Sequence, residues 1–271
     1  SECFGFDDEL SHDHDFEPAF CIFVPKDIGS SSVFALEHAY SKLPKEFKGF
    51  TRNRLSAVGG NRHGVIVLED FLEARLGSKT GELSSSDWFF LPEQAVAEVI
   101  NGELFFDGSG KFSLIRENLK YMPEDVRLKK LAGNLLLMNQ AGQYNYNRLI
   151  LRNDTAAAQL AVIEFVKSTL NVIFLLNRTY IPYYKWVFRT LKALPILSNL
   201  TSDLEALIST DNSDHIQKSK LIEKICGEIK AHLENNALTT FKGDSLEAHA
   251  YSVNNKISDH NIRNLHILYA V

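Results

Sequence analysis

The first third of the chain alternates short apolar runs with segments of helical periodicity. Residues 20–24 are almost wholly apolar, which predicts a buried strand. Residues 33–47 carry apolar side chains three and four positions apart, as a helix does. The β-branched run 64–68 predicts a central strand, and 69–76 predicts a helix that stops at Gly77. This order of strand, helix, strand and helix predicts a small α/β unit.

A Gly-rich turn follows in the middle of the chain. Residues 92–100 predict a short helix with a proline at its start. Residues 103–113 place two short runs around the turn 107–110, which predicts a β-hairpin. The hairpin either extends the sheet of the first domain or forms a lid.

The second half of the chain is patterned for helices throughout. We expect helices at 126–139, 145–152, 155–176, 184–192, 200–208, 214–235 and 246–271. The shift in pattern predicts two domains, 1–113 and 114–271. The predicted fold class is α+β, with a small mixed sheet in the first domain followed by an all-α helical bundle.

Composition narrows the classes of function. The 271 residues are 45% hydrophobic and 23% charged, which is typical of a globular protein. The net charge of −5 argues against broad nucleic-acid binding but leaves room for a local basic pocket. The three cysteines have no metal-ligand spacing, and no apolar run approaches the roughly 20 residues that span a bilayer. We therefore expect a cytoplasmic protein without a membrane partner.

The candidate chemistry starts with two aspartates ahead of the first strand. If the chain is extended there, Asp13 and Asp15 face one side and His14 faces the other. Two carboxylates in one small volume repel each other unless a cation lies between them, and Mg²⁺ prefers such oxygen ligands. The alternative interpretation is a solvated acidic turn before a buried strand.

Ser1, followed by Asp13-His14-Asp15 and an apolar strand, resembles the Gly-Ser, then Asp-x-Asp, signature of the nucleotidyltransferase superfamily. That superfamily includes the polymerase-beta-like and kanamycin-nucleotidyltransferase-like enzymes. The resemblance implies that Ser1 binds the triphosphate of a nucleotide and that Asp13 and Asp15 are catalytic ligands of two Mg²⁺ ions. Because the glycine of the signature would precede Ser1, we expect the native protein to have an upstream segment, a helix plus a first strand.

The second half carries a further resemblance. Three of its segments resemble a bacterial family known as the DUF4037 domain of unknown function. These are Gly142-Gln143-Tyr144-Asn145-Tyr146-Asn147-Arg148, Arg152-Asn153-Asp154 and the stretch 176–189. The resemblance covers essentially the whole chain, including Gly5-Phe6-Asp7-Asp8. It implies a nucleotidyltransferase-like first half joined to a helical second half.

Three basic residues of the second half are candidates for binding the nucleotide. Arg148 and Arg152 are four positions apart, so on one helix they share a face that suits a phosphate. The alternative is a structural network with Asp154. Lys185 could reach a β- or γ-phosphate while a nearby tyrosine stacks on the base, or its aromatic neighbours could form a domain interface. Lys129-Lys130, by contrast, is predicted to be an exposed helix face.

The third carboxylate that usually completes this superfamily's site has no secure match. Ile66 lies in the second strand, where an acid might be expected. Glu69 and Asp70 follow that strand, but acids also suit a solvated helix start. Glu164 of the helical half is another candidate for the base.

We therefore expect a Mg²⁺-dependent nucleotidyltransferase that uses a nucleoside triphosphate. Its acceptor would be a hydroxyl group on a small molecule, a protein or an RNA. The alternative is a non-catalytic nucleotide- or metal-binding or interaction module that retains the fold and lacks the third acid.

Overall fold

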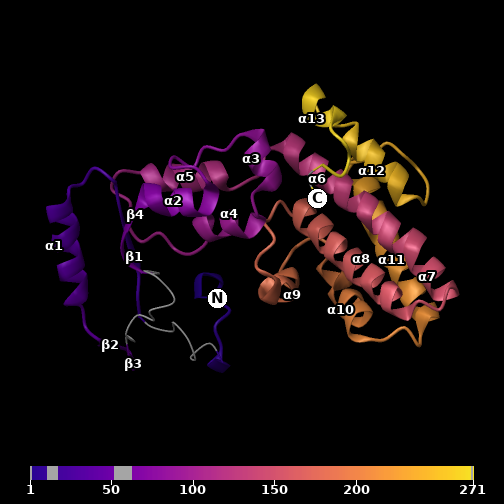
Figure 1. Ribbon diagram of the computed structural model, residues 1–271, viewed down its shortest axis with the longest axis horizontal. Coiled ribbons are helices and arrows are strands. Elements are labelled where there is room, and N and C mark those ends of the chain that lie inside the picture. The colour runs from indigo at the N-terminus through magenta and orange to yellow at the C-terminus, as the bar shows by residue number, and fades with distance from the viewer. Residues whose placement is uncertain (1, 11–17, 52–62, 270) are drawn as a thin grey trace. The chain divides into compact units, whose positions relative to one another are not determined.

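The computed structural model describes residues 2–10, 18–51, 63–269 and 271 (Figure 1). The chain divides into two compact units. The first unit comprises Ser1–Leu83 and Ala95–Lys120, and the second comprises Ser84–Gln94 and Tyr121–Val271. The strands belong to the first unit and the long helices to the second, so the fold class is α+β as predicted. That 1–113 and 114–271 are separate domains stays a prediction.

The first unit is built on a pair of parallel strands. β1 (Cys21–Val24) and β4 (Gly64–Val67) pair with Cys21 opposite Gly64. Parallel strands need a long crossover, and α1 (Ser30–Ser41) lies within the connection. At the amino end of the pair, the carbonyl oxygen of Phe20 accepts from the Gly64 amide and the Tyr40 hydroxyl, both at 3.0 Å. A two-residue antiparallel pair, β2 (Glu46–Phe47) with β3 (Phe50–Thr51), completes the described strands.

Helices α2 (Leu68–Leu76) and α5 (Lys111–Leu119) contribute aromatic side chains that pack on the strand pair. The ring centroid of Phe23 on β1 lies 5.0 Å from that of Phe71 and 4.8 Å from that of Phe112. Helix α2 ends at Gly77, whose backbone is left-handed with φ of 68°, as its predicted stop requires. These contacts fix the carboxyl end of β1 against two helices.

The predicted hairpin at 103–113 is wrong, because α5 begins within it at Lys111 and no strand is present between residues 103 and 113. The Asp107 carboxylate accepts from the amide of Gly110 at 2.9 Å and from the amide of Ser113 at 2.8 Å. A carboxylate that satisfies the first amides of a helix stabilises the start of that helix. The Gly-rich turn therefore caps a helix instead of joining two strands.

The second unit is helical. Helix α4 (Glu93–Ile100) begins in it and continues into the first unit. Its other elements are α3 (Ser85–Phe90), α6 (Glu124–Met138), η3 (Asn139–Tyr146), α7 (Asn147–Leu151), α8 (Thr155–Leu176), η4 (Tyr184–Trp186), α9 (Val187–Leu191), η5 (Ser198–Leu200), α10 (Thr201–Ser209), α11 (His215–Asn235), α12 (Leu246–Asn254) and α13 (His260–Asn264). The bounds of α8 are those predicted. Asp154 caps α8 and Asp214 caps α11, each accepting an amide hydrogen bond at 3.1 Å.

Helix α8 is the apolar centre of the second unit. By length and composition it could cross a membrane, since its mean hydropathy is 1.6. It is 61% buried over that window, and core helices of globular proteins meet the same criteria. Phe165, Val172, Ile173 and Phe174 are fully buried on it, and it packs along α6 (Figure 1).

The segment η3 is a π-helix that continues α6. It contains the Gly142-Gln143-Tyr144-Asn145-Tyr146 motif. Gly142 is buried against Phe165 of α8, and the Gln143 amide donates to Glu223 of α11 at 3.0 Å. Tyr146 is fully buried and donates to Asn212 at 3.1 Å. Much of this motif therefore holds helices together.

The prediction that Lys129-Lys130 forms an exposed helix face is wrong. Lys129 is 0% exposed, and its ammonium group donates to Asn254 Oδ1 at 2.9 Å and to the carbonyl oxygen of Leu265 at 2.6 Å. Lys130 lies 3.4 Å from a carboxylate oxygen of Glu93. The C-terminal segment covers this face of α6, because the predicted helix 246–271 is instead two short helices, α12 and α13, joined by a turn.

Candidate functional site

The residues predicted to hold the metal ions lie outside the part of the chain that the structure describes. These are Ser1, Asp13 and Asp15, and their roles stay predictions. The described chain resumes at residue 18 and enters β1 at Cys21. Because β1 and β4 are parallel, the predicted aspartate pair leads into the amino edge of the strand pair.

Glu69 and Asp70, the candidates for a third acid, follow the carboxyl end of β4 and begin α2. Glu69 lies 2.8 Å from the Lys111 ammonium group and accepts the Lys26 amide at 3.0 Å. Asp70 pairs with the Lys26 ammonium group at 3.1 Å. The hydrogen bond from Lys111 lowers the pKa of Glu69. Both carboxylates are thus engaged with lysines at the edge opposite to the one where the chain enters β1.

The described residues contain no ready-made metal centre. In the ranges 2–10, 18–51, 63–269 and 271, no three His, Cys, Asp or Glu side chains lie close enough to hold a metal ion. Glu164, the other candidate base, lies 3.5 Å from Lys167 on an exposed part of α8. Asp13 and Asp15 stay the predicted metal ligands.

Arg148 and Arg152 lie at the surface around α7. The Arg148 guanidinium group donates to the Tyr144 hydroxyl at 2.7 Å and lies 4.5 Å from the centroid of that ring. Arg152 follows the last residue of α7 and is exposed. Asp154 caps α8, and among the described residues it forms no ion pair with either arginine. The predicted pairing with Asp154 is therefore absent there, and the phosphate role of the arginines stays a prediction.

Lys185 belongs to an exposed group of aromatic and basic side chains. Its ammonium nitrogen lies 5.0 Å from the Trp186 ring centroid, and the Arg189 guanidinium carbon lies 5.9 Å from the same centroid. The rings of Tyr183 and Tyr184 contact each other with centroids 4.4 Å apart. Tyr184 is 75% exposed and Tyr183 is 46% exposed. The group is therefore open to solvent within the second unit.

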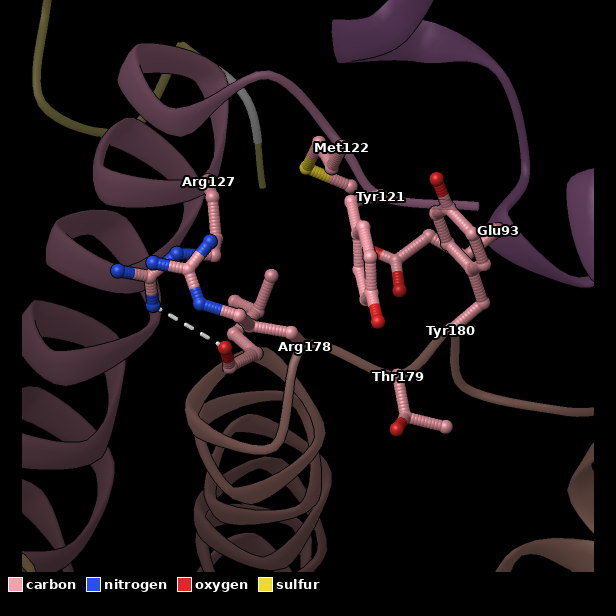
Figure 2. A pocket seen from close by; sticks show the side chains of 8 residues that line it. Glu93, Tyr121, Met122, Arg127, Arg178, Thr179 and Tyr180 are labelled. Atoms are coloured by element: carbon pink, nitrogen blue, oxygen red, sulfur yellow. Dashed lines mark hydrogen bonds between the residues drawn. The ribbon is translucent and has the colours of Figure 1, made fainter. Parts of the chain in front are cut away.

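A pocket lies beside the start of α6 in the second unit, and Figure 2 shows its lining. Its empty volume is about 270 Å³, including space open to solvent. In Figure 2, Tyr121, Glu93 and Tyr180 lie on one side and the guanidinium groups on the other. The lining residues are Glu93, Tyr121, Met122, Arg127, Leu175, Arg178, Thr179 and Tyr180.

The charged groups of this pocket are mostly engaged with one another or with nearby helix ends. Glu124 pairs with Arg127 at 2.7 Å and with Arg178 at 2.9 Å, and the hydrogen bond from Arg127 lowers the pKa of Glu124. Arg127 also donates to the carbonyl oxygen of Leu175 at 3.1 Å, near the end of α8 (Figure 2). Glu93 accepts the Ile181 amide at 3.2 Å. This network joins two helices and a loop, so its first role is structural.

Sequence reasoning did not identify the cluster of Glu124, Arg127 and Arg178. The three-residue spacing of Glu124 and Arg127 at a helix start is a visible local signal. Arg178 joins them because α8 packs along α6, and its backbone is left-handed with φ of 53° just past the end of α8. That contact is set by tertiary packing, which the local pattern does not specify.

Comparison with known proteins gives one match. Residues 88–187 match the family described as a domain of unknown function, DUF4037. The matched region runs from α3 to the start of α9 and includes the π-helix and the exposed aromatic group. No curated protein and no solved structure matches the chain.

Proposed function

We propose that this chain, whose residues 88–187 match the DUF4037 family, is a Mg²⁺-dependent nucleotidyltransferase. It would transfer a nucleotidyl group from a nucleoside triphosphate to a hydroxyl group of an acceptor. In this reaction the acceptor oxygen forms a bond to the α-phosphorus and the bond to the β-phosphate oxygen breaks. Pyrophosphate leaves, and the acceptor proton passes to a base.

The observation that carries this proposal is the Asp13-His14-Asp15 sequence ahead of β1, with Ser1 upstream of it. Carboxylate oxygens are the ligands Mg²⁺ prefers, so the donor chemistry of Asp13 and Asp15 fits this ion. When bound, Mg²⁺ would neutralise charge on the phosphates. The Ser1 hydroxyl would bind the terminal phosphates. The structure supports the proposal only in that β1, which follows the acidic segment in the sequence, pairs in parallel with β4.

Arg148 and Arg152, ahead of α8, and Lys185, beyond its end, are the proposed nucleotide-binding residues of the helical half. Because α8 is about 33 Å long, one nucleotide would contact either the arginines or Lys185. All three side chains are exposed, and none forms an ion pair with a described carboxylate. Exposed guanidinium and ammonium groups can pair with phosphate oxygens at little desolvation cost.

A second candidate is a nucleotide-binding module without turnover. It is favoured by the lysine partners of Glu69 and Asp70, because these ion pairs occupy the only acids that follow β4 directly. A site with two metal-binding aspartates and no base could bind a nucleotide without transferring it.

The two candidates separate in one experiment. Pyrophosphate release is measured with each nucleoside triphosphate and Mg²⁺, and thermal unfolding is followed with the same ligands. A transferase releases pyrophosphate, and a double variant Asp13→Asn, Asp15→Asn loses at least about a hundredfold in rate, close to 2.7 kcal/mol. Asp27→Asn, an exposed acid just beyond β1, is the matched control and should keep full activity.

The same data identify the alternative. Thermal stabilisation by nucleotide and Mg²⁺ without pyrophosphate release would support the binding module, because a ligand bound only by the native state raises stability. If neither release nor stabilisation occurs, or if both persist in the double variant, the proposed metal site is wrong.

A further inference from the structure

The exposed aromatic and basic group around η4 and α9 is formed by Tyr183, Tyr184, Lys185, Trp186 and Arg189. We infer that this group, the aromatic-basic patch, binds single-stranded nucleic acid. The inference does not depend on nucleotidyl transfer, because it concerns binding in the absence of a nucleoside triphosphate and Mg²⁺.

Two adjacent tyrosines are exposed in one turn of the patch. Tyr184 is 75% exposed and Tyr183 is 46% exposed. The backbone of this turn is fixed, since Pro182 is buried and the Trp186 amide donates to the carbonyl oxygen of Tyr183 at 2.9 Å. Exposed aromatic rings on a fixed backbone are the platforms on which unpaired bases stack, at about 1–3 kcal/mol per base.

Two cationic side chains lie beside an aromatic ring of the patch. The Lys185 ammonium nitrogen and the Arg189 guanidinium carbon lie 5.0 and 5.9 Å from the centroid of the Trp186 ring. Lys185 forms no ion pair in the part of the chain that the structure describes. Cations interleaved with aromatic rings match the alternating phosphates and bases of a nucleic-acid strand.

The stretch of sequence that contains the patch is basic. The chain as a whole carries a net charge of −5, but the sequence between Glu164 and Asp203 contains no Asp or Glu. Its basic residues are Lys167, Arg178, Lys185, Arg189 and Lys192. Lys167, Arg178 and Lys192 pair with carboxylates from outside this stretch, at 3.5, 2.9 and 2.9 Å. Lys185 is thus a basic residue of this stretch that pairs with no carboxylate of the described residues, and it lies in the aromatic-basic patch.

These features favour a single strand over a duplex. In a duplex the base faces are stacked inside, so tyrosines cannot reach them, and duplex binding by phosphate contacts alone needs a broad basic surface. The acidic net charge argues against such a surface. A short single strand offers both base faces and phosphates to a patch of this size.

The test is fluorescence anisotropy with labelled 12-nucleotide adenine strands, one RNA and one DNA, and a 12-base-pair duplex, titrated with the whole chain at about 50 mM salt. We expect saturable binding of the single strands and none of the duplex; the two single-strand arms show which sugar is preferred. Tyr184→Ala should weaken binding about 5- to 150-fold, because the loss of one stacked base costs about 1–3 kcal/mol. Tyr184→Phe keeps the ring and should bind like the unaltered chain.

The cations are tested by salt dependence. The double variant Lys185→Ala, Arg189→Ala should reduce the slope of log affinity against log salt by about 1.4, since each lost phosphate contact on a single strand contributes about 0.7. Tyr251→Ala and Lys220→Ala, which alter an exposed tyrosine on α12 and an exposed lysine on α11, should change neither quantity.

Three outcomes would overturn the inference. They are the absence of saturable single-strand binding, binding that survives both patch variants, and competition by a poly-glutamate peptide as effective as that by unlabelled strand. The last result would assign the patch to an acidic protein partner.

Discussion

Two glycines in helices of the second unit should respond to alanine in opposite directions. A Cβ atom on Gly142, in the π-helix η3, would lie 2.4 Å from Cδ2 of Phe165 and 2.9 Å from Cγ2 of Ile222. Phe165 is 0% exposed and Ile222 is 1% exposed, so neither side chain can move into solvent. A Cβ atom on Gly227, in α11, would have no neighbour within 4 Å.

The magnitudes follow from these contacts. Replacing glycine by alanine in a helix without a clash stabilises the fold by about 0.5–1 kcal/mol, which is the expected gain for Gly227→Ala. The same gain applies at Gly142, but overpacking of a full core costs about 1–3 kcal/mol and sometimes more. A contact of 2.4 Å belongs at the upper end of that range. Taking a cost of about 3 kcal/mol less the gain of about 0.5–1 kcal/mol, we expect Gly142→Ala to lower the free energy of unfolding by about 2–2.5 kcal/mol.

The assay is urea unfolding followed by tryptophan fluorescence. Both tryptophans of the chain, Trp88 and Trp186, lie in the second unit, so the signal reports the unit that holds both glycines. A Gly142→Ala variant as stable as the unaltered chain would refute the close packing of η3 on α8. A Gly227→Ala variant with lowered stability would refute the open space beside Gly227.

Three further predictions concern buried or paired groups. Lys129→Met should lower the free energy of unfolding by about 1–3 kcal/mol in urea, because Asn254 Oδ1 and the Leu265 carbonyl oxygen lose the ammonium group that donates to them. Glu124→Gln should reduce the loss of stability in acid, as measured by thermal unfolding between pH 3 and pH 6. The pKa of Glu124 is lower in the folded protein than its ordinary value of 4.5, so its carboxylate stabilises the fold above that value. This stabilisation is lost as the pH falls through the folded pKa. Cys226 is buried, and burial raises the pKa of its thiol. Iodoacetamide at neutral pH should therefore alkylate exposed Cys3 and react with Cys226 only after urea is added, which mass spectrometry measures.

Each of these has a result that contradicts it. Lys220→Met, at an exposed lysine, is the control for Lys129→Met, and its free energy of unfolding should stay within about 0.5 kcal/mol of the unaltered chain. Equal losses of stability in the two variants would mean that Lys129 is not buried. An acid transition in the Glu124→Gln variant as steep as in the unaltered chain would exclude that carboxylate as its source. Rapid alkylation of Cys226 without urea would contradict the packing of α11.

The sequence was sufficient where local chemistry decides the structure. Helix 155–176 was predicted with its observed bounds, because Asp154 caps its start and an uninterrupted apolar pattern carries it to Leu176. Gly77 ends α2 for an equally local reason, its left-handed backbone. The strands at 20–24 and 64–68 were confirmed to within a residue, since β-branched and aromatic runs favour strands.

Prediction failed where distant segments decide the structure. The burial of Lys129 depends on carbonyl and amide oxygens of residues beyond 250, and the sequence pattern of α6 does not predict them. At 103–113 two local signals compete. The Gly-rich turn favours a hairpin, but the Asp107 carboxylate accepts amides at the start of a helix, and the helix forms. For the candidate site, the pattern of Asp13 and Asp15 indicates a metal ion but does not identify a third ligand, which would have to come from another part of the fold.

The most direct test of the proposed metal site is a titration with Mn²⁺, a paramagnetic substitute for Mg²⁺, in the presence of a non-hydrolysable nucleoside triphosphate analogue. Electron paramagnetic resonance measures the Mn²⁺ bound to the protein after subtraction of that bound by the nucleotide alone. The proposal predicts nucleotide-dependent binding in the unaltered chain and in Asp27→Asn, and its loss in the Asp13→Asn, Asp15→Asn double variant. Equal binding by the double variant and the unaltered chain would contradict it.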